Sequence, residues 1–141
     1  MDKNEIYEIF LSRIRDKDLA LLSKEDMMEQ LDIYLKRGLA RCTAIEGVEL
    51  DSSTGAFTRN LTSLEIDIIS LAMVLEWIYP RVNNIQNMYS RISDKDYTVF
   101  SQAKMLDSLK TLRDETEKEF LFWHNKYQLK KFMEENNKWV I

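Results

Sequence analysis

The chain has 141 residues, enough for one domain that buries a core without a metal or disulfides. Its 3 glycines and 1 proline are too few for a turn-rich β-fold, and the single cysteine, Cys42, excludes an internal disulfide and indicates a reducing compartment. The net charge of −4, with 12 acidic and 8 basic side chains in residues 1–51, gives no sign of a basic nucleic-acid-binding stripe. We therefore expect a single all-α domain over residues 1–141.

The first residues predict a helix and not a targeting segment. The opening M-D-K-N-E-I-Y-E-I-F lacks the basic and then apolar stretches of a secretory signal, so we expect synthesis in the cytoplasm. Ile6, Ile9, Phe10 and Ile14 recur at helical spacing and predict a first helix over residues 4–15.

A second helix is predicted from a capping box to about Arg41. In Ser23-Lys24-Glu25-Asp26, the serine oxygen can accept from an early backbone N–H, and a carboxylate follows three residues later. The apolar residues behind it share one helical face: Met27, Leu31, Tyr34, Leu35 and Leu39.

Residues 43–61 are the one long irregular segment, because they hold two of the three glycines and show no helical periodicity. The triplets V-E-L and A-F-T flank the turn D-S-S-T-G, so a small β-hairpin and a plain loop both fit. Asp51, Ser53 and Gly55 resemble the start of a calcium loop, but its later ligands and closing glutamate are missing, which favours a turn.

A third helix, over residues 63–79, opens at a second capping box, Thr62-Ser63-Leu64-Glu65. It is apolar on nearly every side and must be enclosed by its own domain or by a neighbouring subunit. Its apolar run of 14 residues is shorter than the about 20 residues that a membrane span needs, so we expect no membrane partner. Pro80 should end or kink this helix, and the next apolar residues predict another helical face: Val82, Ile85, Tyr89 and Ile92.

The last helix is expected to be the longest element. A third capping box, Ser93-Asp94-Lys95-Asp96, precedes a chain without Gly or Pro, and apolar residues recur at steps of three and four as far as Tyr127. A helix over residues 94–135 would be about 60 Å long, so part of it should project or meet a partner. The sequence thus predicts about five helices, with a central buried apolar helix and a long C-terminal helix.

No residue pattern indicates catalysis. His124 is the one histidine, and Leu121, three residues before it, breaks the Glu-x-x-His pattern of di-metal bundles. The three glycines are too far apart for a phosphate-binding loop, and Cys42 has no histidine near it in the sequence, so we read it as an idle thiol. We expect no enzymatic activity, no metal and no cofactor.

The end of the chain is the candidate partner-binding segment. After Phe132-Met133 comes the polar run E-E-N-N-K, followed by Trp139, Val140 and Ile141. An apolar end of this kind lowers solubility when it is left in water, and aromatic anchors are typical of interface hot spots. We assign Phe132 and the tail of residues 136–141 to partner binding; the tail could dock on its own core or on another subunit.

The order of these segments resembles a known family. The stretch S-K-E-D-M-M-E-Q-L, an irregular segment with G-A-F, the apolar N-L-T-S-L-E-I-D-I-I-S-L-A-M-V-L-E-W-I and then S-D-K-D-Y-T-V-F-S-Q-A look like small neck proteins of tailed bacteriophages. These are the head-to-tail connector, or head-completion adaptor, proteins. The resemblance spans roughly residues 5–125.

The resemblance implies a structural virion protein made in the host cytoplasm and located in the phage neck. Proteins of this family assemble as a ring, commonly of twelve copies, on the portal protein and extend the DNA channel, through which DNA passes without sequence-specific binding. In the family the C-terminal helix and tail often grip the portal; here Phe132 and residues 139–141 match them. The same residues also fit a second hypothesis, a cytoplasmic helical adaptor or regulator that binds one protein partner.

Overall fold

The computed structural model describes residues 1–91 and 97–136, and the side chains of residues 86–102 are not part of that description. The described residues form helices and no strand, which confirms the all-α prediction. The five helices are α1 (Asn4–Arg13), α2 (Lys17–Ala20), α3 (Lys24–Arg41), α4 (Ser63–Arg91) and α5 (Tyr97–Glu135).

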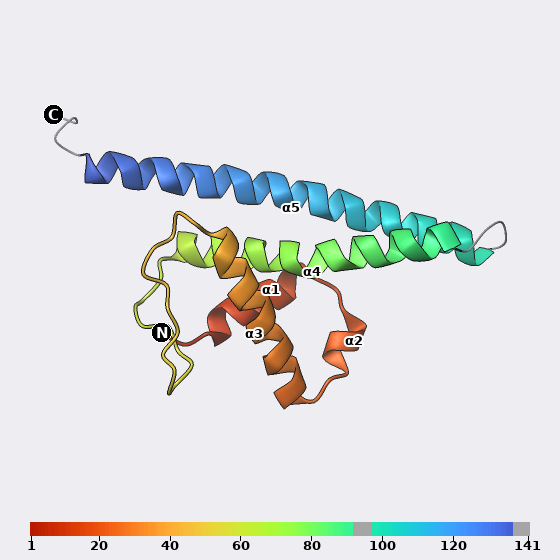
Figure 1. Cartoon of the computed structure of the whole chain (residues 1–141), viewed down its shortest axis with the longest axis horizontal. Helices are drawn as coiled ribbons and strands as arrows, with labels where there is room; N and C mark the ends of the chain where they lie inside the picture. Colours follow the sequence, from red (N-terminus) through yellow and green to blue (C-terminus); the bar gives the residue numbers. More distant parts are fainter. Residues whose placement is uncertain (92–96, 137–141) are drawn as a thin grey trace.

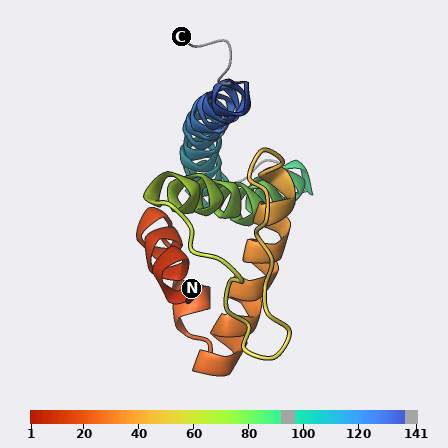
Figure 2. The ribbon, with the colours of Figure 1, turned by 90° about the vertical axis from the view of Figure 1, so that its left-hand side faces the viewer.

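The helices are arranged in three layers, with α4 in the middle. Figures 1 and 2 show α5 along one side of α4, and α1 and α3 on the other side. Helix α4 packs against each of α1, α3 and α5. It is therefore the central helix that the sequence predicted.

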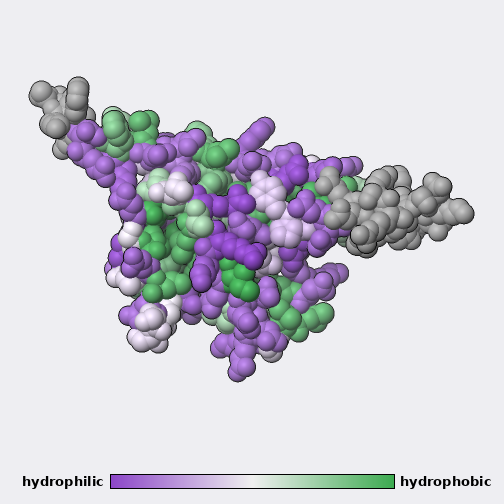
Figure 3. Space-filling view, in the orientation of Figure 1, coloured by the Kyte–Doolittle hydropathy of each residue, from purple (hydrophilic) through white to green (hydrophobic). Residues whose placement is uncertain are grey.

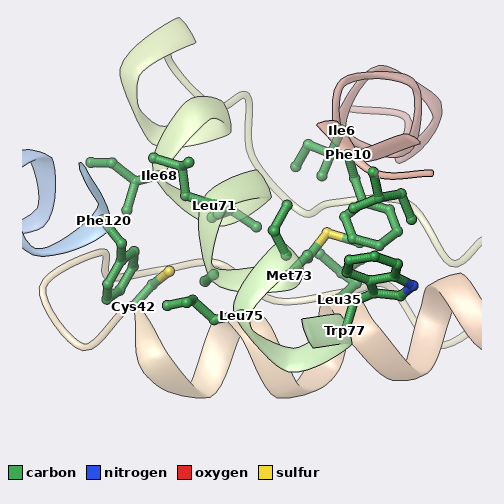
Figure 4. Packing of buried hydrophobic residues seen from close by; sticks show 14 of the residues in the cluster. Ile6, Phe10, Leu35, Cys42, Ile68, Leu71, Met73, Leu75, Trp77 and Phe120 are labelled. Carbon is green, nitrogen blue, oxygen red and sulfur yellow. The ribbon is translucent and has the colours of Figure 1, made fainter. Parts of the chain in front are cut away.

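The core surrounds α4. From Ile66 to Trp77 most of its side chains are buried, and Ile68, Ile69 and Met73 are fully enclosed. Figure 4 shows the partners that converge on it: Ile6 and Phe10 from α1, Leu35 from α3 and Phe120 from α5. Burying large apolar side chains from four helices around one axis is the main stabilising contribution to this fold.

Of the two outcomes predicted at Pro80, an end or a kink, the end does not occur, because α4 continues through the proline to Arg91. Proline removes one backbone hydrogen bond, but tertiary contacts hold the helix at this point. The Arg81 guanidinium donates to the Trp77 carbonyl at 2.8 Å, lies 4.4 Å from the Trp77 ring centroid and pairs with Asp16. Trp77 Nε1 donates to the same Asp16 carboxylate at 2.9 Å.

Asp16 also begins α2, a one-turn helix that the sequence did not predict. Its carboxylate accepts from the backbone N–H of Leu19 at 3.0 Å, as an N-cap does. The number of helices agrees with the prediction only because α2 is added while the segments before and after Pro80 merge.

Two of the three predicted capping boxes can be compared with the structure. The Asp26 N–H donates to Ser23 Oγ at 3.1 Å at the start of α3. At the start of α4 the bonds are reciprocal: the Glu65 N–H donates to Thr62 Oγ1 at 3.2 Å, and the Thr62 N–H donates to Glu65 Oε1 at 2.9 Å. The box at Ser93 lies outside the described residues.

Residues 43–61 contain a turn with a single antiparallel bridge, between Leu50 and Phe57, in place of a full hairpin. Gly55 adopts φ +72°, a left-handed conformation that side-chain-bearing residues rarely take, and its N–H donates to the Asp51 carbonyl at 2.7 Å. The Phe57 main chain also pairs with Met1, so this segment is joined to the residues before α1.

Candidate partner-binding surface

Four apolar residues were assigned to partner binding, Phe132, Trp139, Val140 and Ile141, and the structure describes one of them. Phe132 lies on α5 with 62% of its surface exposed. Trp139, Val140 and Ile141 lie outside the described residues.

Phe132 belongs to a larger apolar surface on the second half of α5, which we call the α5 outer face. Each member keeps between 49% and 62% of its surface exposed. Figure 3 shows hydrophobic residues over this end of α5. A surface of exposed apolar side chains on one helix is typical of an interaction site. The α5 outer face consists of Leu121, Phe122, Leu129, Phe132 and Met133.

The opposite side of α5 is buried and fixes the direction of the outer face. Thr116, Phe120 and His124 recur at steps of four on this side and are all buried. His124 Nε2 accepts from the Ala44 N–H at 3.1 Å, and its ring stacks on Phe120 with 5.2 Å between centroids. This bond needs a neutral imidazole, and burial lowers the pKa of His124.

A buried carboxylate joins α5 to the start of α4. Glu65 is 2% exposed and accepts hydrogen bonds from both terminal nitrogens of Arg59, at 3.1 and 2.6 Å, and from the Tyr127 hydroxyl at 2.8 Å. Burial opposes its charge, but these bonds, with the Thr62 N–H, lower the pKa of Glu65 to about 2. Burial, together with the bond to Glu65, raises the pKa of Tyr127 to about 12.

The loop after α3 provides a further anchor. Lys131 Nζ pairs with the Glu46 carboxylate at 3.0 Å and lies 3.5 Å from the Ala44 carbonyl. With His124 and Tyr127, it gives the inner side of α5 polar contacts over two helical turns. The outer face is therefore presented in a defined orientation.

An open groove of about 590 Å³ lies beside the outer face, between α5 and the first turn of α4. Its surface is mostly apolar, and Lys126 and Lys130 contribute its two positive charges against one carboxylate, Glu134. Lys126 Nζ lies 5.3 Å from the Trp123 ring centroid, which places this charge over the groove wall. The other lining residues are Leu64, Trp123, Leu129 and Met133.

The thiol of the one cysteine is enclosed in the core. Cys42 is buried, and burial raises the pKa of its thiol to about 12, so it holds its proton at neutral pH. Within residues 1–91 and 97–136, no group of three or more His, Cys, Asp or Glu side chains is placed to hold a metal ion. In the same described ranges, no helix has the length and apolar character to cross a membrane.

Sequence reasoning identified only Phe132 on this surface and missed the other four residues. The periodic run of Phe120, Trp123 and Tyr127 already accounts for the packed side of the helix. Apolar residues that fall between its members, such as Phe122 and Leu129, must then point away from the core. The positions of these residues around the helix therefore indicated a second, exposed apolar face.

Comparison of the chain with protein-family models, with curated proteins and with solved structures found no match. The resemblance to phage neck proteins therefore depends on the order and character of the sequence segments alone.

Proposed function

We propose that the chain is a non-enzymatic structural protein of a phage virion, a head-to-tail connector that assembles as a ring on the portal. The observation that carries the proposal is the α5 outer face, an apolar surface rigidly presented on the longest helix of the chain. A surface that costs solubility in a monomer fits a chain whose working state is an assembly. The resemblance of the helix order to neck proteins supplies the kind of assembly.

In this proposal Phe132 and the tail that follows α5 contact the portal or the next neck protein. Phe132 is the exposed aromatic anchor on α5, and Trp139, Val140 and Ile141 extend the apolar character beyond the helix. DNA passes through the ring without sequence-specific contacts, which suits a chain with a net charge of −4.

The test is to co-express the chain with the portal protein encoded near its gene and to image the complex by electron microscopy. We expect a ring of this chain on the portal, and weaker or absent rings after deletion of residues 136–141. Circular dichroism of the shortened chain should keep its helical spectrum, because the deletion leaves α1 to α5 intact.

The alternative function, a helical adaptor for a single protein partner, predicts a different result. A small complex of fixed, low copy number with a non-virion protein would contradict the connector proposal. Metabolic genes beside the coding gene would also contradict it, whereas portal, capsid and tail genes would support it.

A further inference from the structure

A second exposed surface lies at the start of α3 and combines apolar with acidic side chains. Leu21 is 82% exposed, and Leu22 and Ile33 are also exposed large apolar residues. Between Leu22 and Ile33 lie the exposed carboxylates Glu25, Asp26 and Glu29, against one exposed lysine. We call Leu22, Glu25, Glu29 and Ile33 the α3 acidic face.

The α3 acidic face and the α5 surface are complementary in charge. The groove beside the α5 outer face has Lys126 and Lys130 on its wall, while the α3 acidic face has Glu25 and Glu29. Each pair is separated by four residues, so both pairs are spaced by about 6 Å along their helices. Two ion pairs can therefore form at once when the helices lie side by side.

The apolar residues match the same alignment. Ile33 follows Glu29 by four residues on α3, and Phe122 precedes Lys126 by four residues on α5. In an antiparallel alignment Ile33 therefore falls opposite Phe122, and Leu22, which lies two residues before α3 begins, is at the end nearer Met133. The same alignment sets Glu25 opposite Lys130 and Glu29 opposite Lys126. Apolar contacts then flank the two ion pairs, one at each end of the interface.

We propose that Phe122, Met133 and the two groove lysines of α5 bind the α3 acidic face of a second copy of this chain, in this antiparallel alignment, while Phe132 and the tail stay with the portal. The inference deepens the proposed function, because it names the contact between neighbouring copies. Burial of the apolar ends supplies most of the affinity, and the exposed ion pairs set the register.

The acidic stretch of α5 itself is a poorer partner. Residues 114–119 carry four carboxylates, but no large apolar side chain is exposed between Leu106 and Phe120. A contact there would satisfy the lysines and leave the α5 outer face in water. The α3 acidic face satisfies both requirements.

The position of the two surfaces makes the contact head-to-tail. Figures 1 and 2 show α5 at one extreme of the molecule and the first turn of α3 at the other, with α4 between them. Two copies cannot exchange both contacts with each other when the surfaces face opposite directions. Each copy must use one surface for each of two neighbours, which produces a ring if the rotation closes and an open chain if it does not.

The experiment uses two charge-reversed forms of the full chain, Lys126→Glu/Lys130→Glu and Glu25→Lys/Glu29→Lys, with masses measured by sedimentation velocity. The unchanged chain should assemble with rising concentration. Each reversed form alone should be monomeric, since it sets like charges opposite each other, and an equal mixture of the two should regain the mass of the assembly. Circular dichroism checks that both forms keep the helical spectrum, as expected for exposed positions.

Two further variants test the apolar part and the specificity. Ile33→Gln should raise the dissociation constant about tenfold or more. Met105→Gln is the matched control, because Met105 is an exposed apolar residue of α5 outside the outer face, and this variant should assemble as the unchanged chain does.

Three results would overturn the inference: an unchanged chain that stays monomeric at all concentrations, a Glu25→Lys/Glu29→Lys form that still assembles alone, or a mixture that remains monomeric. A monomeric chain that nevertheless forms rings on the portal would leave the proposed function standing without this contact. Head-to-tail assembly without any binding to a portal would support this contact and contradict the proposed function.

Discussion

Helices α4 and α5 both carry many apolar residues, yet of the described residues only the stretch 66–78 of α4 is enclosed on most sides. Helix α4 is covered by α1, α3 and α5, whereas α5 packs against α4 on one side and presents Phe122, Leu129 and Phe132 to solvent on the other. The difference shows that the apolar character of a helix indicates that it will be buried but not which element or molecule buries it. For α4 the cover is the same chain; for α5 we propose a second copy on Phe122 and Met133 and the portal on Phe132.

The largest expected difference is between two matched truncations. Ile69 of α4 is fully buried and Leu129 of α5 is 59% exposed. Ile69→Ala should lower the free energy of unfolding by about 2–5 kcal/mol, because it leaves a cavity. Leu129→Ala should change it by less than about 0.5 kcal/mol. Urea unfolding of the chain, at concentrations below any assembly, measures both; equal losses would show that the α5 outer face is covered within the monomer.

A smaller effect is expected at the polar link between the two helices. Glu65→Gln keeps the size of the side chain but removes the charge that Arg59 and Tyr127 contact. Near neutral pH the variant should be less stable by about 2 kcal/mol, since charge-assisted hydrogen bonds to a buried group are lost. Urea unfolding measures the difference, and Glu115→Gln, at an exposed position of α5, is the control.

The same pair of proteins should converge in acid. The pKa of Glu65 is about 2 in the folded chain and about 4.5 in the unfolded chain, so its contribution is complete above pH 4.5 and is lost as the pH falls toward 2. Between pH 6 and pH 3 the unchanged chain should lose about 2 kcal/mol more than Glu65→Gln does. Parallel pH profiles for the two proteins would contradict this assignment.

A third change tests how closely α3 crosses α4. A Cβ atom on Gly38 would lie 3.1 Å from Met73 Cγ and 3.2 Å from the Met73 backbone nitrogen. Gly38→Ala gains about 1 kcal/mol in helix propensity, but overpacking costs about 1–3 kcal/mol. We expect a net loss of about 1 kcal/mol. A melting temperature above that of the unchanged chain would show that the helices can separate without cost.

The smallest effect concerns the inner side of α5. Burial lowers the pKa of His124 below 6.5 in the folded chain, so the unfolded chain takes up a proton first as the pH falls. Stability should therefore decrease as the pH drops below about 6.5, until the folded-state pKa is reached. Because the chain has a single histidine, its NMR titration can be assigned without ambiguity. A midpoint at or above 6.5 would contradict the assignment of His124 as a neutral imidazole that accepts from the Ala44 N–H.

Much of the fold could be predicted because its determinants are local. The caps at Ser23 and Thr62 were recognisable, since a capping hydrogen bond joins residues three apart in the sequence. The course of the chain at Pro80 could not be predicted, because Asp16, which pairs with Arg81 there, is 65 residues away. The candidate surface was predicted only at Phe132, where it approaches the polar tail, since apolar composition alone does not distinguish a packed side from an exposed one.

The sequence by itself determined that the chain is all-α, where α3 and α4 begin, and that α4 lies in the core, because helix periodicity, capping and apolar content depend on neighbours within a few residues. The tertiary structure decided that α4 passes Pro80, that Glu65 joins the ends of α4 and α5, and that His124 accepts from Ala44. It also decided which apolar side of α5 faces α4 and which faces solvent. Burial depends on what lies opposite a side chain, and residues distant in the sequence supply that.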